Sequence, residues 1–167
     1  MSTGQITEQF SGIYPMLYAF FDQAGHLDRG AMRAQVRGAL AQGVHGIAVG
    51  GLATETNKLS TEERRSLMTW AAEDVAGQAP LSISIAENNV PGQAAMAQLA
   101  ADLGAAWVVL QPPPVRGVAE AELSRFYGAV ADLSPLPVGI QNAPDYIGIG
   151  LSNAGFAELR RRHPNIS

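Results

Sequence analysis

Continuous apolar stretches alternate along the chain with segments in which apolar residues recur every three or four positions. The first pattern predicts strands and the second predicts amphipathic helices. The predicted strands cover residues 12–21, 44–49, 80–86, 106–110 and 137–140, and the predicted helices follow them at about 28–42, 60–76, 92–103, 120–132 and 152–162. Such apolar strands are typical of a parallel sheet that is covered on both faces. The pattern therefore predicts five successive βα units.

The unit around residues 46–63 carries the clearest local signals. An apolar strand ends at Gly50-Gly51, a polar loop follows, and Ser60-Thr61-Glu62-Glu63 has the S-x-x-E form of a capping box that opens a helix. In parallel α/β proteins the loop after a strand is where ligands bind, because the backbone can approach them closely there. Asp28 and Ser152 are placed to cap two other helices.

Five βα units fit either a doubly wound, flavodoxin-like sheet or part of an eight-stranded barrel. The loop after the first strand, residues 22–26, lacks the glycine-rich fingerprint of a phosphate-binding doubly wound sheet. Polar residues instead follow several strands, at Thr54-Glu55, Glu87-Asn88-Asn89, Gln111 and Gln141-Asn142. Groups from so many strand ends converge only when the strands form a ring. We therefore predict an α/β fold, a (β/α)8 TIM barrel of which this chain supplies roughly the first five βα units. The alternative is a complete five-stranded domain.

We expect an N-terminal leader at residues 1–11 and a partial barrel domain at residues 12–167. Composition narrows the class further. The chain has 167 residues, 47% of them hydrophobic and 16% charged, with a formal net charge of −4 and no cysteine. The absence of a basic run argues against nucleic acid or an anionic membrane as partner. The lack of an export signal, of a spanning segment and of cysteine predicts a cytoplasmic location.

Several short motifs, in order, resemble one enzyme family. They are residues 12–15 (G-I-Y-P) with Phe21-Asp22, residues 51–55 (G-L-A-T-E) with residues 59–64 (L-S-T-E-E-R), Asn88 with residues 102–106 (D-L-G-A-A), residues 141–144 (Q-N-A-P), and Leu151-Ser152. Their order and spacing resemble the dihydrodipicolinate synthase and N-acetylneuraminate lyase family of class I aldolases. The resemblance covers nearly the whole chain.

This resemblance implies a (β/α)8 barrel whose strand-six lysine forms a Schiff base with pyruvate or a related 2-keto acid. That lysine is expected just beyond Ser167. The only lysine in the chain is Lys58, which would be either a solvated loop residue or, if desolvated, an imine-forming group. The resemblance implies a homodimer or homotetramer, no metal and no organic cofactor.

The departures from the family pattern carry information too. The family's paired threonines, which grip the substrate carboxylate, correspond to Leu52 and Ala53, whose side chains donate no hydrogen bonds. The tyrosine that relays protons corresponds to Gln141, and the tyrosine from a neighbouring subunit corresponds to Pro114. The family arginine aligns near Tyr146. We therefore expect a divergent member that is not a true dihydrodipicolinate synthase.

The predicted site contains Gly51, Thr54, Glu55, Gln141 and Asn142 as substrate-binding residues. With the two threonines lost, carboxylate binding falls to backbone N–H groups from Gly51 to Thr54, to the Thr54 hydroxyl, or to the helix N-terminus at Ser60. Thr54 is equally a turn former, and Glu55 is favoured as a structural carboxylate over a general base. Gln141 is the strongest candidate for a substrate contact, the alternative being an amide bonded to backbone.

Two functions follow from these residues. The first is a Schiff-base lyase or aldolase acting on a 2-keto acid. The alternative is a barrel whose chemistry has lapsed and which serves as a small-molecule binding or assembly subunit.

Overall fold

The computed structural model describes residues 10–115 and 117–167. Residues 1–9 of the predicted leader lie outside the described part. The strands are β1 (Ile47–Val49), β2 (Leu81–Ile85), β3 (Trp107–Leu110) and β4 (Val138–Ile140). The helices are α2 (Arg29–Ala41), α3 (Thr61–Val75), α4 (Val90–Asp102), α5 (Glu120–Leu133), α6 (Pro144–Ile147) and α7 (Asn153–Arg162), with a 3-10 turn η1 (Thr56–Lys58). No helix among them is long and apolar enough to cross a bilayer.

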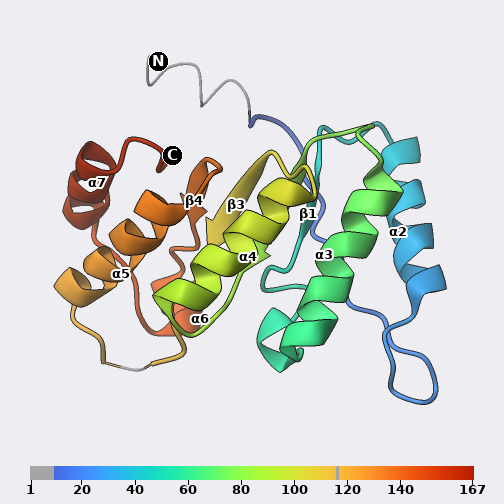
Figure 1. The fold of residues 1–167 in the computed structure, drawn as a ribbon, viewed down its shortest axis with the longest axis horizontal. Helices are drawn as coiled ribbons and strands as arrows, with labels where there is room; N and C mark the ends of the chain where they lie inside the picture. The colour runs from blue at the N-terminus through green and yellow to red at the C-terminus, as the bar shows by residue number, and fades with distance from the viewer. Residues whose placement is uncertain (1–9, 116) are drawn as a thin grey trace.

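The four strands form one parallel sheet in the order β1-β2-β3-β4 (Figure 1). Because parallel crossovers are right-handed, this sequential order puts the connecting helices on one face of the sheet. A doubly wound sheet would reverse its order part-way and place helices on both faces. The strand order therefore matches an arc of a barrel, which confirms the predicted repetition of βα units.

The two faces of the sheet differ in side-chain size. The helix-covered face carries large aliphatic residues such as Ile83 and Leu110, both with no exposed surface or nearly none. The opposite face carries Ala48, Ser82 and Trp107 in one aligned row, and Ser84, Val109 and Gly139 in the next. In β1 and β2 a large aliphatic position thus alternates with a small or polar one, whereas β3 places Trp107 and Val109 on the second face.

The predicted first strand at residues 12–21 is wrong in extent. Only Met16 pairs with β1, through an isolated parallel bridge to Ala48. Leu17 N–H donates to Ala48 O (2.8 Å) and Ala48 N–H donates to Pro15 O (3.0 Å). Pro15 has no N–H to extend the ladder, which limits the pairing here. Neighbouring side chains such as Ile13 and Tyr18 are 66% and 55% exposed, unlike an edge strand of a complete five-stranded domain.

A second isolated bridge lies on the other edge of the sheet. Ile166 pairs in parallel with Val138, and Val138 N–H donates to Asn165 O (2.8 Å). Six consecutive chain segments therefore run parallel across the arc, from Met16 to Ile166. The sixth segment begins to pair beside β4 at Ile166, just before the position beyond Ser167 at which the family resemblance implies strand six.

The helix starts follow their predicted caps. Asp28 accepts from Ala31 N–H (2.9 Å), and Ser152 Oγ accepts from Gly155 N–H (3.1 Å). Ser60 and Glu63 form the complete capping box that opens α3. These caps satisfy N–H groups that the first helical turn leaves unpaired. The short helix α6 was not predicted and lies inside the loop that follows β4.

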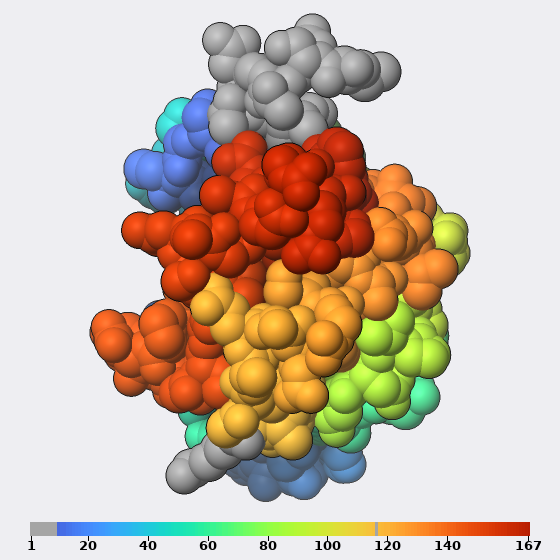
Figure 2. Space-filling model, turned by 90° about the vertical axis from the view of Figure 1, so that its left-hand side faces the viewer, coloured from blue at the N-terminus to red at the C-terminus, as the bar shows by residue number. Residues whose placement is uncertain are grey.

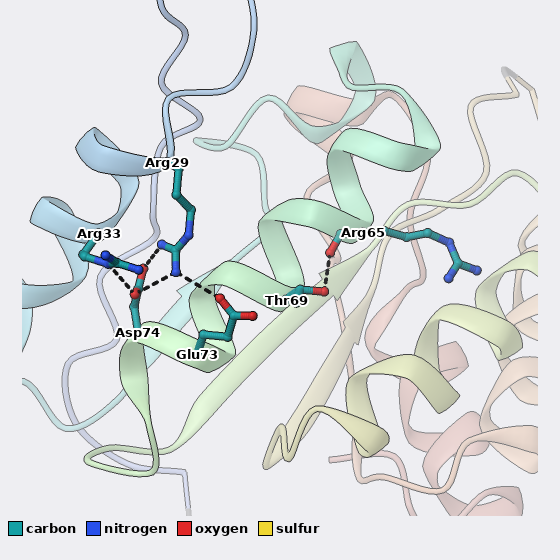
Figure 3. Close-up of polar contacts among 6 residues, drawn as sticks. All are labelled: Arg29, Arg33, Arg65, Thr69, Glu73 and Asp74. Atoms are coloured by element: carbon teal, nitrogen blue, oxygen red, sulfur yellow. Dashed lines mark hydrogen bonds and ion pairs between the residues drawn. The ribbon is translucent and has the colours of Figure 1, made fainter.

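An ion cluster joins α2 to α3 (Figure 3). Arg29 and Arg33 both donate to Asp74, whose side chain is only 7% exposed, and Arg29 also pairs with Glu73. Burial alone would raise the pKa of the Asp74 carboxyl, but the two guanidinium groups outweigh it and hold the pKa below its usual value. Arg29 also lies 5.3 Å from the centre of the Trp70 ring.

At the β4 end, α5 and α7 pack together (Figure 2). Glu120 at the start of α5 accepts from both the N–H and the hydroxyl of Ser152, each at 2.7 Å. A side chain at Gly155 would collide with the Glu120 carboxylate, so glycine leaves room for this contact. The carboxylate thereby fixes the start of α7 against α5.

Candidate functional site

The carboxyl edge of the sheet is held together by side-chain amides. Gln111, which follows β3 and is 7% exposed, donates through Nε2 to Gly50 O (3.0 Å). Gln93 of α4, which is fully buried, donates through Nε2 to Gln111 O and to Glu87 O, both at 2.9 Å. Backbone groups after β1, β2 and β3 are thus joined. Gln93 was not predicted, although an amide near the start of an alanine-rich helix was a possible signal for it.

Thr54 lies beneath the loop that follows β1, with 1% of its surface exposed. Its hydroxyl donates to Leu17 O (2.6 Å) and accepts from Gly50 N–H (3.0 Å). A hydroxyl has one proton to donate, and here it is used within the protein. This geometry favours the turn-forming interpretation of Thr54 over direct ligand binding.

The backbone N–H groups of the same loop divide into two sets. Those of Gly50 and Gly51 point to Thr54 Oγ1 and to Met16 Sδ (3.3 Å). Those of Leu52 and Ala53 make no hydrogen bond to any other described residue, and both residues are exposed. Adjacent unpaired N–H groups in a turn are suited to binding an anion such as a carboxylate. Of the three predicted sources of carboxylate binding, the Thr54 hydroxyl is used within the protein, whereas the backbone of this loop and the first turn of α3 both keep N–H groups without a partner among the described residues.

Glu55 differs from the structural role favoured for it. It has a left-handed backbone (φ 54°), and its carboxylate contacts Lys58 Nζ at 2.6 Å instead of backbone N–H groups. The two side chains are 63% and 68% exposed. Lys58 is therefore a solvated loop residue, the first of the two interpretations given for it.

The pair of residues that follows β4 separates into two roles. Asn142 bonds both to Leu151 O (3.0 Å) and to Leu151 N–H (2.8 Å), so it fixes the loop that contains α6. Gln141 is half-buried and makes no side-chain hydrogen bond to a described residue. It lines an open hollow beside α7 together with Phe156 and Arg160. The structure thus does not bring Gln141 into one cavity with the loop after β1.

Arg64 and Glu87 form a half-buried ion pair that the sequence prediction missed. Arg64 Nε donates to Glu87 Oε1 at 2.9 Å, and each side chain is 15% exposed. The guanidinium also donates to Leu59 O and to Thr61 Oγ1. The pair ties the loop after β1 to the loop after β2.

A cavity of about 370 Å³ opens at the carboxyl edge between three loops. Its walls come from the loops that follow β1, β3 and β4, and the lining residues are Leu52, Asn57, Gln111, Pro112, Pro113, Pro114, Val115, Tyr146, Ile147 and Ile149. None of these lining residues is charged. Among the described residues, no cluster of three or more His, Asp or Glu side chains is arranged to hold a metal ion.

The opposite end of the sheet is closed by aromatic rings. Trp107 at the start of β3 stacks on Phe10 (5.1 Å between centroids) and meets the edge of Tyr14 (6.1 Å). Two residues of the predicted leader, Phe10 and Ser11, fall in the described part of the chain. Of these, Phe10 packs against the sheet through Trp107. The cavity between loop side chains lies at the carboxyl edge, the other end of the arc from these aromatic contacts.

Comparison with known proteins decides the family. The model of the dihydrodipicolinate synthetase family matches residues 9–167. The chain belongs to this family. The match confirms the resemblance drawn from the motifs, and with the strand order it identifies the sheet as part of a (β/α)8 barrel.

Individual relatives show the extent of the similarity. A 4-hydroxy-tetrahydrodipicolinate synthase of Xanthomonas axonopodis is 35% identical over 93% of this chain and 51% of its own length. An L-2-keto-3-deoxyarabonate dehydratase of Azospirillum brasilense is 29% identical over 95% of this chain and 52% of its own length.

Solved structures are similar over the same span. YagE, a prophage protein of the dihydrodipicolinic acid synthase family from Escherichia coli K12 in complex with pyruvate, superposes with a TM-score of 0.88 at 30% identity. The match covers 95% of this chain and 54% of YagE. The chain thus spans about half the length of the relatives it matches.

Proposed function

We propose that the protein is a lyase or aldolase that forms a Schiff base with pyruvate or a related 2-keto acid. The observation that carries the proposal is the pair of free N–H groups at Leu52 and Ala53, at the carboxyl edge of a family barrel. A 2-keto acid presents a carboxylate next to its carbonyl, and two adjacent N–H donors suit that carboxylate. The pyruvate complex of YagE and the dehydratase among the relatives support the same substrate class.

The other predicted site residues have different roles in this proposal. Thr54 and Gly51 fix the path of the loop so that the two free N–H groups face the substrate. Gln141 lines the separate hollow beside α7, so its contact with a substrate oxygen stays a prediction, and its amide cannot act as a general acid near neutral pH. Asn142 shapes the loop after β4, and Glu55 stays at the solvent side.

The covalent step needs an amine on a neighbouring strand. We propose that a lysine after Ser167 supplies it, on the strand that begins to pair at Ile166 beside β4. Its nitrogen adds to the keto carbon, the carbonyl oxygen leaves as water, and a C=N bond forms. The protonated imine then accepts the electron pair released when a bond to the neighbouring carbon breaks. Assembly as a homodimer or homotetramer stays a prediction.

The test is borohydride reduction of the full-length protein with pyruvate, followed by peptide mass spectrometry. A reduced adduct on a lysine beyond Ser167 is the expected result. Because Lys58 is the only lysine in residues 1–167, an adduct within these residues would identify it and would overturn the assignment. A Lys58→Arg variant serves as the control and should keep the adduct.

The alternative, a binding or assembly subunit, has its own support. Leu52 and Ala53 offer no side-chain donors, and the hydroxyl of Thr54 is occupied by Leu17 O. If no adduct forms with any of several 2-keto acids while the protein still binds them, this alternative replaces the lyase.

A further inference from the structure

The cavity at the carboxyl edge is walled mainly by aliphatic and ring side chains. Leu52 comes from the loop after β1, Pro112–Pro114 and Val115 from the loop after β3, and Ile149 from the loop after β4. Leu52 and Val115 line the cavity and are 47% and 52% exposed, far more than the aliphatic residues of the sheet. An apolar surface gathered from three loops at one mouth is typical of a ligand pocket.

The walls are held in place before any ligand arrives. Three consecutive prolines have fixed φ angles, and Val115 N–H donates to Pro113 O (2.8 Å). On the opposite side, the two bonds between Asn142 and Leu151 close the loop that carries Ile149. A preformed apolar wall binds without a large loss of conformational freedom.

The polar groups of the cavity are few and partly used. Asn57 and Gln111 line it with amides and Tyr146 with a phenol hydroxyl, and Gln111 already donates to Gly50 O. A ligand with several hydroxyl groups or a second carboxylate would lose its water shell there without equivalent partners. An apolar group would instead gain from leaving water.

Leu52 belongs to both parts of the site. Its N–H is one of the two free donors proposed for the carboxylate, and its side chain lines the apolar cavity. A ligand held at the backbone of Leu52 by its carboxylate therefore has its far end in reach of the apolar wall.

We propose that this cavity takes an aryl or branched-alkyl group at the end of the substrate remote from the carboxylate. The inference rests on the proposed function and names its substrate class. In the aldol direction, C3 of pyruvate loses a proton and bonds to the carbon of an aromatic aldehyde, whose oxygen takes up a proton. The product is a 4-aryl-4-hydroxy-2-keto acid. The reverse reaction breaks the same C3–C4 bond.

The experiment compares two 2-keto acids by calorimetry on the full-length protein, 4-phenyl-2-oxobutanoate and 2-oxoadipate. They differ in carrying a phenyl ring or a second carboxylate at the far end. The expected result is binding of the phenyl compound at least tenfold tighter. Equal binding, tighter binding of 2-oxoadipate, or binding of neither overturns the inference.

Two exposed positions provide matched variants. Val115→Asp puts a charge on the cavity wall and should weaken binding of 4-phenyl-2-oxobutanoate tenfold or more. Leu133→Asp, at a residue that is 59% exposed on α5 and does not line the cavity, should leave that binding unchanged. Equal effects of the two variants would contradict the assignment of the wall.

Borohydride trapping with pyruvate on the same samples separates the two proposals. An adduct without preference for the phenyl compound leaves the lyase standing and removes the apolar subsite. A preference for the phenyl compound without an adduct keeps the subsite and removes the Schiff-base chemistry.

Discussion

Replacing Glu87 by glutamine tests whether the ion pair with Arg64 stabilises the carboxyl edge. Glutamine has nearly the same shape, so the packing around the side chain is kept. The change removes the negative charge opposite a guanidinium that is 15% exposed. Arg64 would keep its bonds to Leu59 O and Thr61 Oγ1 and would retain a neutral acceptor at residue 87.

The expected cost follows from two contacts. Arg64 Nε and Nη2 lie 2.9 and 2.8 Å from Glu87 Oε1. A hydrogen bond to a charged group contributes about 1 kcal/mol more than a neutral one, and with the second close contact of the ion pair the expected cost is roughly 1–2 kcal/mol. Removing one partner of a fully buried pair costs roughly 3–5 kcal/mol. Because this pair is partly exposed, we expect a smaller cost, close to the figure obtained from the two contacts.

The assay is urea unfolding of the full-length protein, followed by circular dichroism. Glu55→Gln is the matched control, because it removes a carboxylate from the neighbouring, largely exposed pair with Lys58. Exposed pairs contribute about 0–1 kcal/mol, so this control should change the free energy of unfolding little. If Glu87→Gln costs no more than Glu55→Gln, the pair does not stabilise the edge and the reasoning is wrong.

Two further predictions concern α2–α3 and the loop after β1. Because the folded pKa of Asp74 is lowered, its contribution to stability is present at neutral pH and is lost as the pH falls below about 4 toward that folded pKa. Urea midpoints between pH 7 and 3 should therefore fall less steeply in Asp74→Asn than in the parent, and parallel slopes would refute this. Gly50→Ala (φ +81°) would bring Cβ within 2.5 Å of Ser84 O, whereas Gly25→Ala (φ +82°) meets open space. Thermal unfolding should show a cost of about 1 kcal/mol for Gly25→Ala and clearly more for Gly50→Ala, and equal costs would be the contrary result.

The elements that the sequence predicts well depend on neighbours in the chain. The capping box at Ser60 and Glu63 and the cap at Ser152 involve residues three positions apart, so their signals are local. The first strand was overestimated because its extent depends on pairing with β1, about thirty residues away. An apolar run with a proline does not specify how many ladder bonds form.

The candidate site shows the same difference between local signals and contacts that join distant residues. The sequence locates polar residues after the strands, and Gln111 indeed lies at that edge. It does not specify that the Thr54 hydroxyl turns toward Leu17, because that contact joins residues 37 positions apart. The partner of Glu87 is equally non-local, since Arg64 stands on the preceding helix. Binding roles at strand ends thus depend on contacts that a residue pattern does not encode.

The inward bonds of Thr54 have a consequence for how this loop can change over generations. Because the Thr54 hydroxyl fixes the turn from the buried side, the exposed side chains of Leu52 and Ala53 contribute little to the path of the backbone. Replacing them alters what an incoming molecule meets while the main chain keeps its position. Such an arrangement lets new selectivity arise by single substitutions without rebuilding the scaffold.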